Sequence, residues 1–287
     1  MAMKIEGTRA AVTGAATGIG RGIALALAEK GAAFVAVADL DLDAAERTAT
    51  EVRARGAKAI SARVDVRHRA ELEKFADLSW AQADGIDLLF NNAGVARVAR
   101  AFDISDADID WLIQVNLMGV IHGTRVFGRR MLQAGKKGWI CNTASEAGVH
   151  GGSPYLAAYT ATKHGVVGYS DAVRTDYSGE IGVSVLCPGI VASSMWNTGA
   201  HRPAELGGPI AHDPAAKAYM EEHGIRPEEA GRVAVEGVEA GAFFIFTHSH
   251  AIDLAAQRFR DQRAGSERRW PPGTAREAAP DTFDPNA

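Results

Sequence analysis

Short runs of apolar residues alternate along this chain with longer segments in which apolar residues recur every three or four positions. The runs at 8–13, 34–38, 59–64, 87–90, 138–143 and 243–246 have the length of buried strands. The longer segments predict helices at about 43–55, 69–83 and 249–264, and Pro227 opens another with two glutamates in its first turn. Alternating units of this length predict a parallel α/β sheet with helices on both faces.

A glycine-rich turn follows the first of these strands and precedes an alanine-rich helix that ends at Gly31. Strand, glycine turn and helix in this order are typical of dinucleotide-binding proteins, because glycines let the backbone approach the pyrophosphate at the helix N-terminus. A plain tight turn is the alternative interpretation. The predicted cofactor-binding residues of this turn are Gly14, Thr17, Gly18, Ile19 and Gly20.

An acidic residue, Asp39, ends the second strand, 19 residues beyond Gly20. A carboxylate at this place can accept both hydroxyls of the adenosine ribose, and it repels the 2′-phosphate of the phosphorylated cofactor. Leu40 follows it, and residues 13–20 contain no lysine or arginine. The sequence therefore predicts NAD rather than NADP, with a helix cap or turn as the alternative role of Asp39. Asp65 and Val66, at the end of the third strand, are expected near the adenine ring.

Composition and charge exclude several classes of protein. With 287 residues, of which 47% are hydrophobic and 23% charged, the chain predicts one globular domain with at most a small appendage. A net charge of −4 gives no support to nucleic-acid binding. We expect a cytoplasmic protein without a membrane anchor, since no signal-like or spanning apolar stretch is visible. Cys141 and Cys187 lie in apolar runs and are expected to be buried and reduced, so no metal site is predicted.

One pair of side chains has the spacing of an acid–base centre. Tyr159 and Lys163 are four residues apart, so in a helix they share one face. A free tyrosine titrates near pH ~10, and a fixed cation close to the phenol lowers its pKa. Such a phenol could exchange a proton with a secondary alcohol. The same spacing also occurs by chance in ordinary helices.

Taken together, these features resemble the short-chain dehydrogenases/reductases, of the simple type with TGxxxGxG and YxxxK motifs. The resemblance covers residues 5–195 and rests on six motifs in the right order and spacing: the glycine turn at 13–20, Asn91-Asn92-Ala93-Gly94, Asn116 in a long helix, Ser145, Tyr159-x-x-x-Lys163 and Pro188-Gly189. It implies a doubly wound, seven-stranded sheet of the Rossmann type. Thr17 departs from the glycine expected in the extended epimerases of the superfamily, and enoyl reductases space their tyrosine and lysine more widely.

The resemblance also implies a role for each matching residue. Tyr159 would be the catalytic acid or base, and Lys163 would lower its pKa and hold the nicotinamide ribose. Ser145 would hydrogen-bond the substrate oxygen, and Asn116 would position a water in a proton relay. Further cofactor contacts are implied for Asn92, Ala93, Gly94, Tyr159, Lys163, Pro188, Gly189, Val191 and Ser193.

Other residues compete for two of these roles. Tyr155 is rejected because position 159 holds a tyrosine where its lysine would be required. Ser153 and Ser184 are less favourable than Ser145, which follows a strand and precedes Tyr159 by 14 residues.

The remaining segments predict a lid and an extension on the catalytic domain at 1–270. Residues 193–225 contain several turn-forming residues and little periodicity, which is typical of a substrate lid. His201 and His212 within it are interpreted as surface histidines. Residues 243–265 form the last strand and a C-terminal helix, whose arginines make a solvated face, and residues 271–287 are expected to be disordered or to lie on a neighbouring subunit.

The predicted function is that of an NAD-dependent oxidoreductase that interconverts a secondary alcohol and a ketone, as a homodimer or homotetramer. The predicted pocket walls, 95–102, 146–156 and the lid, carry no charged clamp, which favours bulky aromatic or alicyclic substrates. Lignin-derived aryl alcohol dehydrogenases of the same family are one comparison of similar length. A binding scaffold or redox sensor without turnover is the alternative, although such a protein has no need of the tyrosine.

Overall fold

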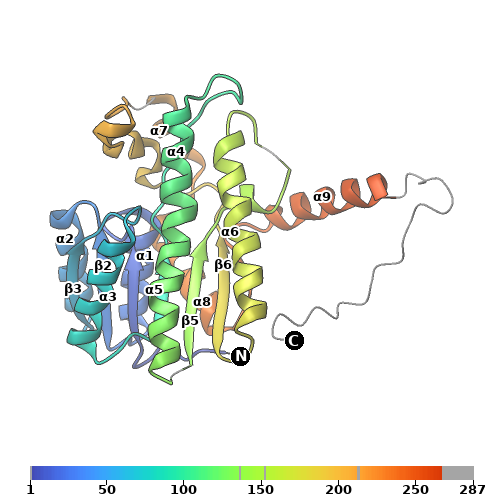
Figure 1. Ribbon diagram of the computed structural model, residues 1–287. Helices are drawn as coiled ribbons and strands as arrows, with labels where there is room; N and C mark the ends of the chain where they lie inside the picture. Colours follow the sequence, from blue (N-terminus) through green and yellow to red (C-terminus); the bar gives the residue numbers. More distant parts are fainter. Residues whose placement is uncertain (1, 136, 152, 212–213, 267–287) are drawn as a thin grey trace.

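The computed structural model describes residues 2–135, 137–151, 153–211 and 214–266 (Figure 1). Within them, seven parallel strands form one sheet in the order β3-β2-β1-β4-β5-β6-β7. The strands are β1 (Arg9–Thr13), β2 (Phe34–Asp39), β3 (Lys58–Arg63), β4 (Leu88–Asn91), β5 (Gly138–Thr143), β6 (Ile181–Cys187) and β7 (Phe244–Phe246). The doubly wound, seven-stranded fold that the sequence predicted is confirmed.

Helices cover both faces of this sheet. Residues of α1 (Gly18–Glu29), α2 (Leu42–Ala54) and α8 (Pro227–Glu239) join the core on one face. Residues of α3 (Arg69–Ala83), α4 (Asp106–Leu112), α5 (Gly119–Gln133) and α6 (Ala157–Asp176) form the core on the other. Two further helices, α7 (Pro214–His223) and α9 (His250–Ser266), lie outside these layers, and α9 extends away from the body (Figure 1).

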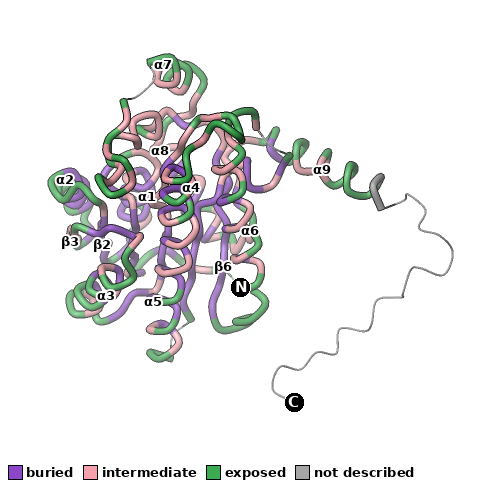
Figure 2. Tube along the Cα trace, turned by 45° about the horizontal axis from the view of Figure 1, so that its top comes forward, coloured by how far each residue is buried: buried purple, intermediate pink, exposed green. Residues whose placement is uncertain are grey.

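The continuous apolar runs of the strands follow from this arrangement, because successive side chains point to opposite faces. In β2, Val35 and Val37 pack on the α1 side, whereas Phe34, Ala36 and Ala38 pack on the α3 side. Figure 2 shows the result as buried strands enclosed by helices whose outer surfaces are exposed.

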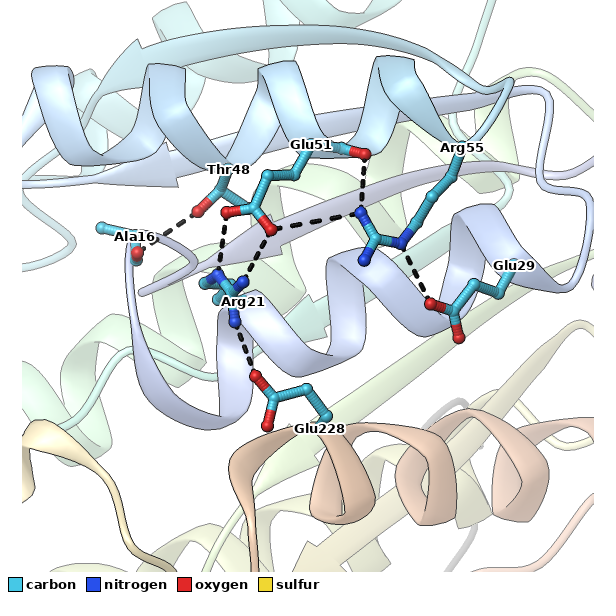
Figure 3. A network of polar contacts seen from close by, with 7 residues as sticks. All are labelled: Ala16, Arg21, Glu29, Thr48, Glu51, Arg55 and Glu228. Atoms are coloured by element: carbon cyan, nitrogen blue, oxygen red, sulfur yellow. Dashed lines mark hydrogen bonds and ion pairs between the residues drawn. The ribbon is translucent and has the colours of Figure 1, made fainter.

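A close crossing joins α1 to α8. A Cβ on Gly231 of α8 would lie 2.1 Å from the carbonyl carbon of Gly22 in α1, so the two backbones touch. Arg21 adds two ion pairs, with Glu51 of α2 at 2.6 Å and Glu228 of α8 at 2.7 Å (Figure 3). These contacts fix the helix that begins at the glycine turn.

The carboxyl ends of the strands carry the predicted site residues, and the strand order reverses between β1 and β4. In open parallel sheets, ligands bind at this switch point. The described residues of the lid segment (193–225) lie over the same edge and contain helices that the sequence did not indicate, η3 (Ser194–His201), η4 (Ala204–Leu206) and α7. The turn-forming residues of this segment interrupt its apolar periodicity, so the sequence pattern did not predict these helices.

Most predicted element boundaries agree with the structure to within one or two residues. The predicted tail, 271–287, lies outside the described residues, as does His212. Among the helices that the structure describes, none is long and apolar enough to cross a membrane.

Candidate active site

A single cavity of about 650 Å³ collects most of the predicted site residues. This volume lies within the range of small-molecule and cofactor sites. The predicted residues that line it are Gly14, Thr17, Gly18, Ile19, Asp39, Leu40, Asp65, Val66, Asn92, Ala93, Gly94, Ser145, Tyr159, Lys163, Pro188, Gly189, Val191 and Ser193. Gly20 and Asn116 do not line it.

The glycine turn brings backbone to the cavity wall. Gly14 and Gly18 have φ angles of +63° and +56°, in the left-handed region that favours glycine. A Cβ on Gly14 would lie 2.6 Å from the Cα of Ala93, and one on Gly20 would lie 2.1 Å from the carbonyl oxygen of Gly14. Gly20 therefore serves the packing of α1 against the turn, and the cavity is lined by the glycines before it.

The Asp39 carboxylate lines the cavity and is also tied to the glycine turn. Its Oδ2 accepts a hydrogen bond from the Ala16 N–H at 2.9 Å, and its Oδ1 accepts one from the Asp41 N–H at 3.3 Å. Burial raises the pKa of Asp39, while these N–H groups and the nearby His201 act in the opposite direction. His201 lines the same cavity, so it is not only a surface residue of the lid.

Two arginines in the cavity wall were missed by sequence reasoning. Arg63 pairs with Asp39 in the register of β3 and β2, and its side chain is 58% exposed. Arg67 is mostly buried and makes ion pairs with Asp65 at 2.6 Å and with Glu205 of the lid segment at 3.0 Å. The signal that could have identified Arg63 is its positive charge at the end of the strand next to that of Asp39, rather than within residues 13–20 or at position 40.

Ser145, Tyr159 and Lys163 meet at the other end of the cavity. Ser145 precedes the turn η2 (Glu146–Gly148), and its hydroxyl accepts from the Ala147 N–H at 3.2 Å and donates to the Pro188 carbonyl at 3.5 Å. It lies near enough to the Tyr159 phenol to lower the pKa of that group. Lys163 is buried, with its Nζ donating to the carbonyl oxygen of Thr143 at 3.0 Å and lying 5.6 Å from the centre of the Tyr159 ring. The helical spacing thus places both side chains on one face of α6, as predicted.

The pKa values of this pair differ from the prediction. Burial raises the pKa of Tyr159 to about 12, with the negative charge of Glu146 adding to it and the Ser145 hydrogen bond opposing it. Burial lowers the pKa of Lys163 to about 8. The predicted lowering of the Tyr159 pKa is therefore wrong for this arrangement, because the loss of solvation on burial is the largest effect on the phenol.

Asn116 supports the site from behind the cavity. It lies in a π-helical turn, η1 (Ile113–Met118), between α4 and α5. Its Oδ1 accepts from the Val95 N–H at 2.8 Å, and its Nδ2 donates to the Val95 carbonyl at 2.9 Å and to Thr162 at 3.3 Å. The side chain thus joins the segment after Gly94 to α6. Its predicted role in a proton relay stays a prediction.

Part of the cavity wall is apolar. Its larger apolar members are Val95, Trp111, Val115, Ile190, Met195, Tyr219 and Met220, with Asn197 and Thr198 as polar members. Val95, Trp111 and Val115 belong to the apolar cluster against which Tyr159 packs. Thr198 holds the lid segment by accepting from the Ala96 N–H at 3.2 Å.

Most of the predicted wall before the lid lies elsewhere: Val95 is the only residue of 95–102 that lines the cavity, and none of the described residues of 146–156 does. Phe102 is fully exposed, and Tyr155 is 58% exposed and does not line the cavity. Of the competing serines, Ser184 is buried in a hydrogen bond with Trp139. Neither Tyr155 nor Ser184 replaces the predicted residues.

Comparison with known proteins agrees with this geometry. A protein-family model described as short chain dehydrogenase matches residues 8–203. The D-threitol dehydrogenase of Mycolicibacterium smegmatis is 39% identical over 194 residues, which are 67% of this chain and 73% of that protein. The "Probable oxidoreductase EphD" of Mycobacterium tuberculosis is 35% identical over 68% of this chain, which spans only 33% of that protein's length.

A solved structure extends the likeness to nearly the whole chain. The short chain dehydrogenase/reductase from Burkholderia phymatum in complex with NAD has a TM-score of 0.85 and 31% sequence identity. The match covers 94% of this chain and 99% of that one.

Proposed function

The chain belongs to the short-chain dehydrogenase family, and we propose that it is an NAD-dependent oxidoreductase that interconverts a secondary alcohol and a ketone. One observation carries this proposal: Ser145, Tyr159 and Lys163 lie at one end of the cavity whose other end holds Asp39 and the glycine turn. Both ends are needed when a cofactor must be held with its reactive ring against a substrate.

The cavity residues fit a dinucleotide. Gly14 and Gly18 allow close approach of a pyrophosphate to the start of α1, where the helix dipole favours negative charge. Asp39 offers carboxylate oxygens to ribose hydroxyls at the edge of β2. NAD, when bound, supplies or accepts the hydride, and Lys163 and the backbone near Pro188 would hold its nicotinamide half.

Tyr159 acts as the general acid or base in this proposal. With a pKa of about 12, its phenol is protonated at neutral pH and is a proton donor to the oxygen of a ketone. The Ser145 hydroxyl, which acts on the pKa of the same phenol, would polarise the substrate oxygen. In the oxidation direction the phenol must first lose its proton, so alcohol oxidation should be favoured at alkaline pH.

Asp39 favours NAD over NADP in this proposal, although Arg63 stands beside it. An ionised carboxylate repels a 2′-phosphate, whereas an exposed guanidinium would attract one. Asp39, which is half-buried and tied to the glycine turn, is expected to outweigh the exposed arginine.

The substrate is proposed to be uncharged and hydrophobic, with an aromatic or alicyclic body. The charged residues of the cavity, apart from Lys163, come from β2, from the end of β3 and from the lid segment, whereas Val95, Trp111 and Val115, which share an apolar cluster with Tyr159, also line the cavity. A homodimer or homotetramer is the expected assembly, which light scattering on the purified protein tests.

An NAD+ reduction screen over a panel of secondary alcohols, with wild type and Tyr159→Phe, tests the function. We expect turnover of hydrophobic members and a loss of about 10²- to 10⁴-fold in Tyr159→Phe. Tyr155→Phe is the matched control, since that tyrosine is outside the cavity. If Tyr159→Phe binds NADH normally and every redox activity is unchanged, the alternative of a non-catalytic scaffold is favoured.

A further inference from the structure

The start of α9 lies against the turn that carries Ser145. Nε2 of His250 is 3.1 Å from Oε2 of Glu146, the residue that follows Ser145. The Glu146 side chain is 20% exposed and that of His250 58% exposed, so the carboxylate is the inner member of the pair. The Glu146 N–H donates to the Pro188 carbonyl at 2.9 Å, which fixes the backbone of the turn against the cavity wall.

A second histidine from the same segment reaches this place. A Cβ on Gly189 would lie 2.6 Å from Nδ1 of His248 and 2.9 Å from Oε2 of Glu146, so these two side chains meet above Gly189. Thr247 contacts Nδ1 of His248 at 2.8 Å and accepts the Gly189 N–H at 3.0 Å. Residues 247–250, from the end of β7 to the first residue of α9, therefore hold both the Glu146 carboxylate and Gly189, which lines the cavity.

The turn that begins with Glu146 packs against α6, the helix of Tyr159 and Lys163: a Cβ on Gly148 would lie 2.8 Å from the carbonyl oxygen of Lys163. The Glu146 charge raises the pKa of Tyr159, in the same direction as burial. Other titratable or charged groups surround Glu146 and the acid–base centre. They are His248 and His250 after β7, Tyr159 and Lys163 on α6, and Cys187 at the end of β6. Further along α9, Arg258 contacts His150 and His164.

On the basis of the function proposed above, we propose that Glu146 and His250 are positioning residues for Tyr159. Glu146 places a negative charge beside the phenol, and His250 holds that carboxylate in place by its hydrogen bond. The first turn of α9 thereby helps to set the pH range in which Tyr159 exchanges its proton. Without His250, the half-buried carboxylate is free to turn toward solvent, where water screens its charge.

The first test is Glu146→Gln, with Glu236→Gln on the exposed face of α8 as control. The ionisation of Tyr159 is followed by NMR of isotope-labelled tyrosine, with its signal assigned by its loss in Tyr159→Phe. The same variants give kcat/KM for alcohol oxidation against pH. Removal of the charge should move both titrations of Glu146→Gln down by roughly 0.5 to 1 pH unit, and the control should not move them. An unchanged Tyr159 titration in Glu146→Gln overturns the proposal.

The second test separates positioning from simple anchoring of α9. His250→Ala should lower the Tyr159 titration in the same direction by a smaller amount, while His250→Gln, which keeps a hydrogen-bond donor, should restore most of the wild-type value. In the Glu146→Gln background, His250→Ala should have no further effect. An equal shift in both backgrounds would show that His250 acts independently of Glu146, against the proposal. Because His250 is exposed, these variants should fold even if Glu146→Gln does not.

The two readouts keep this inference distinct from the proposed function. A shifted NMR titration in a protein that turns over no alcohol would support the positioning role and contradict the proposed reaction. Turnover with an unshifted titration would do the reverse.

Discussion

Lys163 should make the stability of this protein rise with pH. Its side chain is 2% exposed, and burial lowers its pKa from 10.5 to about 8. The unfolded chain keeps the lysine proton up to about pH 10.5, so between pH 8 and 10.5 it binds more protons than the folded chain. Stability therefore increases with pH across this window, and the cost of burying the charged form is fully present below pH 8.

The magnitude follows from the same pKa difference. Each pKa unit corresponds to about 1.4 kcal/mol, so the lysine contributes a change on the order of 3 kcal/mol across the window. Lys163→Met removes the titrating group and keeps much of the buried volume. The free energy of unfolding is measured by urea for both proteins between pH 7 and 10.5. Across this range the wild type should become more stable relative to Lys163→Met by that amount.

The comparison between variants isolates the lysine from other alkaline titrations. Burial raises the pKa of Tyr159 and Cys187 to about 12, and these groups make the folded state lose stability at high pH. Lys163 lowers the pKa of Cys187, but both groups stay protonated in the folded chain up to pH 10.5 with or without the lysine, so their effects cancel in the difference. Lys74→Met, on the exposed side of α3, is the control for loss of one lysine. A difference between wild type and Lys163→Met that stays constant with pH would refute the reasoning.

Three further outcomes are expected. We expect the wild type to prefer NAD over NADP by at least about tenfold in kcat/KM, which corresponds to about 1.4 kcal/mol, and Asp39→Ala should reduce this preference. Equal efficiency of the two cofactors in the wild type would contradict the assignment. Lys163→Ala should weaken NADH binding, whereas Tyr159→Phe should spare it, and the double variant should be little slower than the worse single one; strictly additive rate losses would show that the two do not act as a unit. Gly231→Ala should destabilise the protein by about 1 to 3 kcal/mol in urea unfolding, because its methyl group meets the backbone of α1, while Gly168→Ala, which has no atom within 4 Å of its added carbon, should not.

Local pattern was enough to predict the framework of the fold. The strand β5 and the helix α3 begin and end where periodicity placed them, because each is bounded by residues that change the pattern. The location of Asp39 at a strand end likewise follows from local sequence, since the carboxyl ends of parallel strands share one edge.

Properties that depend on depth and on neighbours from other strands were not accessible in the same way. The direction of the Tyr159 pKa depends on how much solvent the fold removes, which the spacing to Lys163 does not contain. Arg63 enters the cavity through its register with Asp39; the sequence places Arg63 near the end of the third strand, but it does not give that pairing. Glu146 and His250, 104 positions apart, meet only because α9 begins beside the Ser145 turn.

The lid segment begins and ends at the same point of the fold. Val191 forms a parallel bridge with Ile225, the Ala192 N–H donates to the Ile225 carbonyl at 2.9 Å, and the Ile225 N–H donates to the Ile190 carbonyl at 3.1 Å. A segment whose two ends are already joined can change length at little cost, since each doubling of a loop costs only about 0.6 kcal/mol of closure entropy. Lids from other dehydrogenases could therefore be grafted between these two residues, which would alter substrate range while the sheet and its proton chemistry stay untouched.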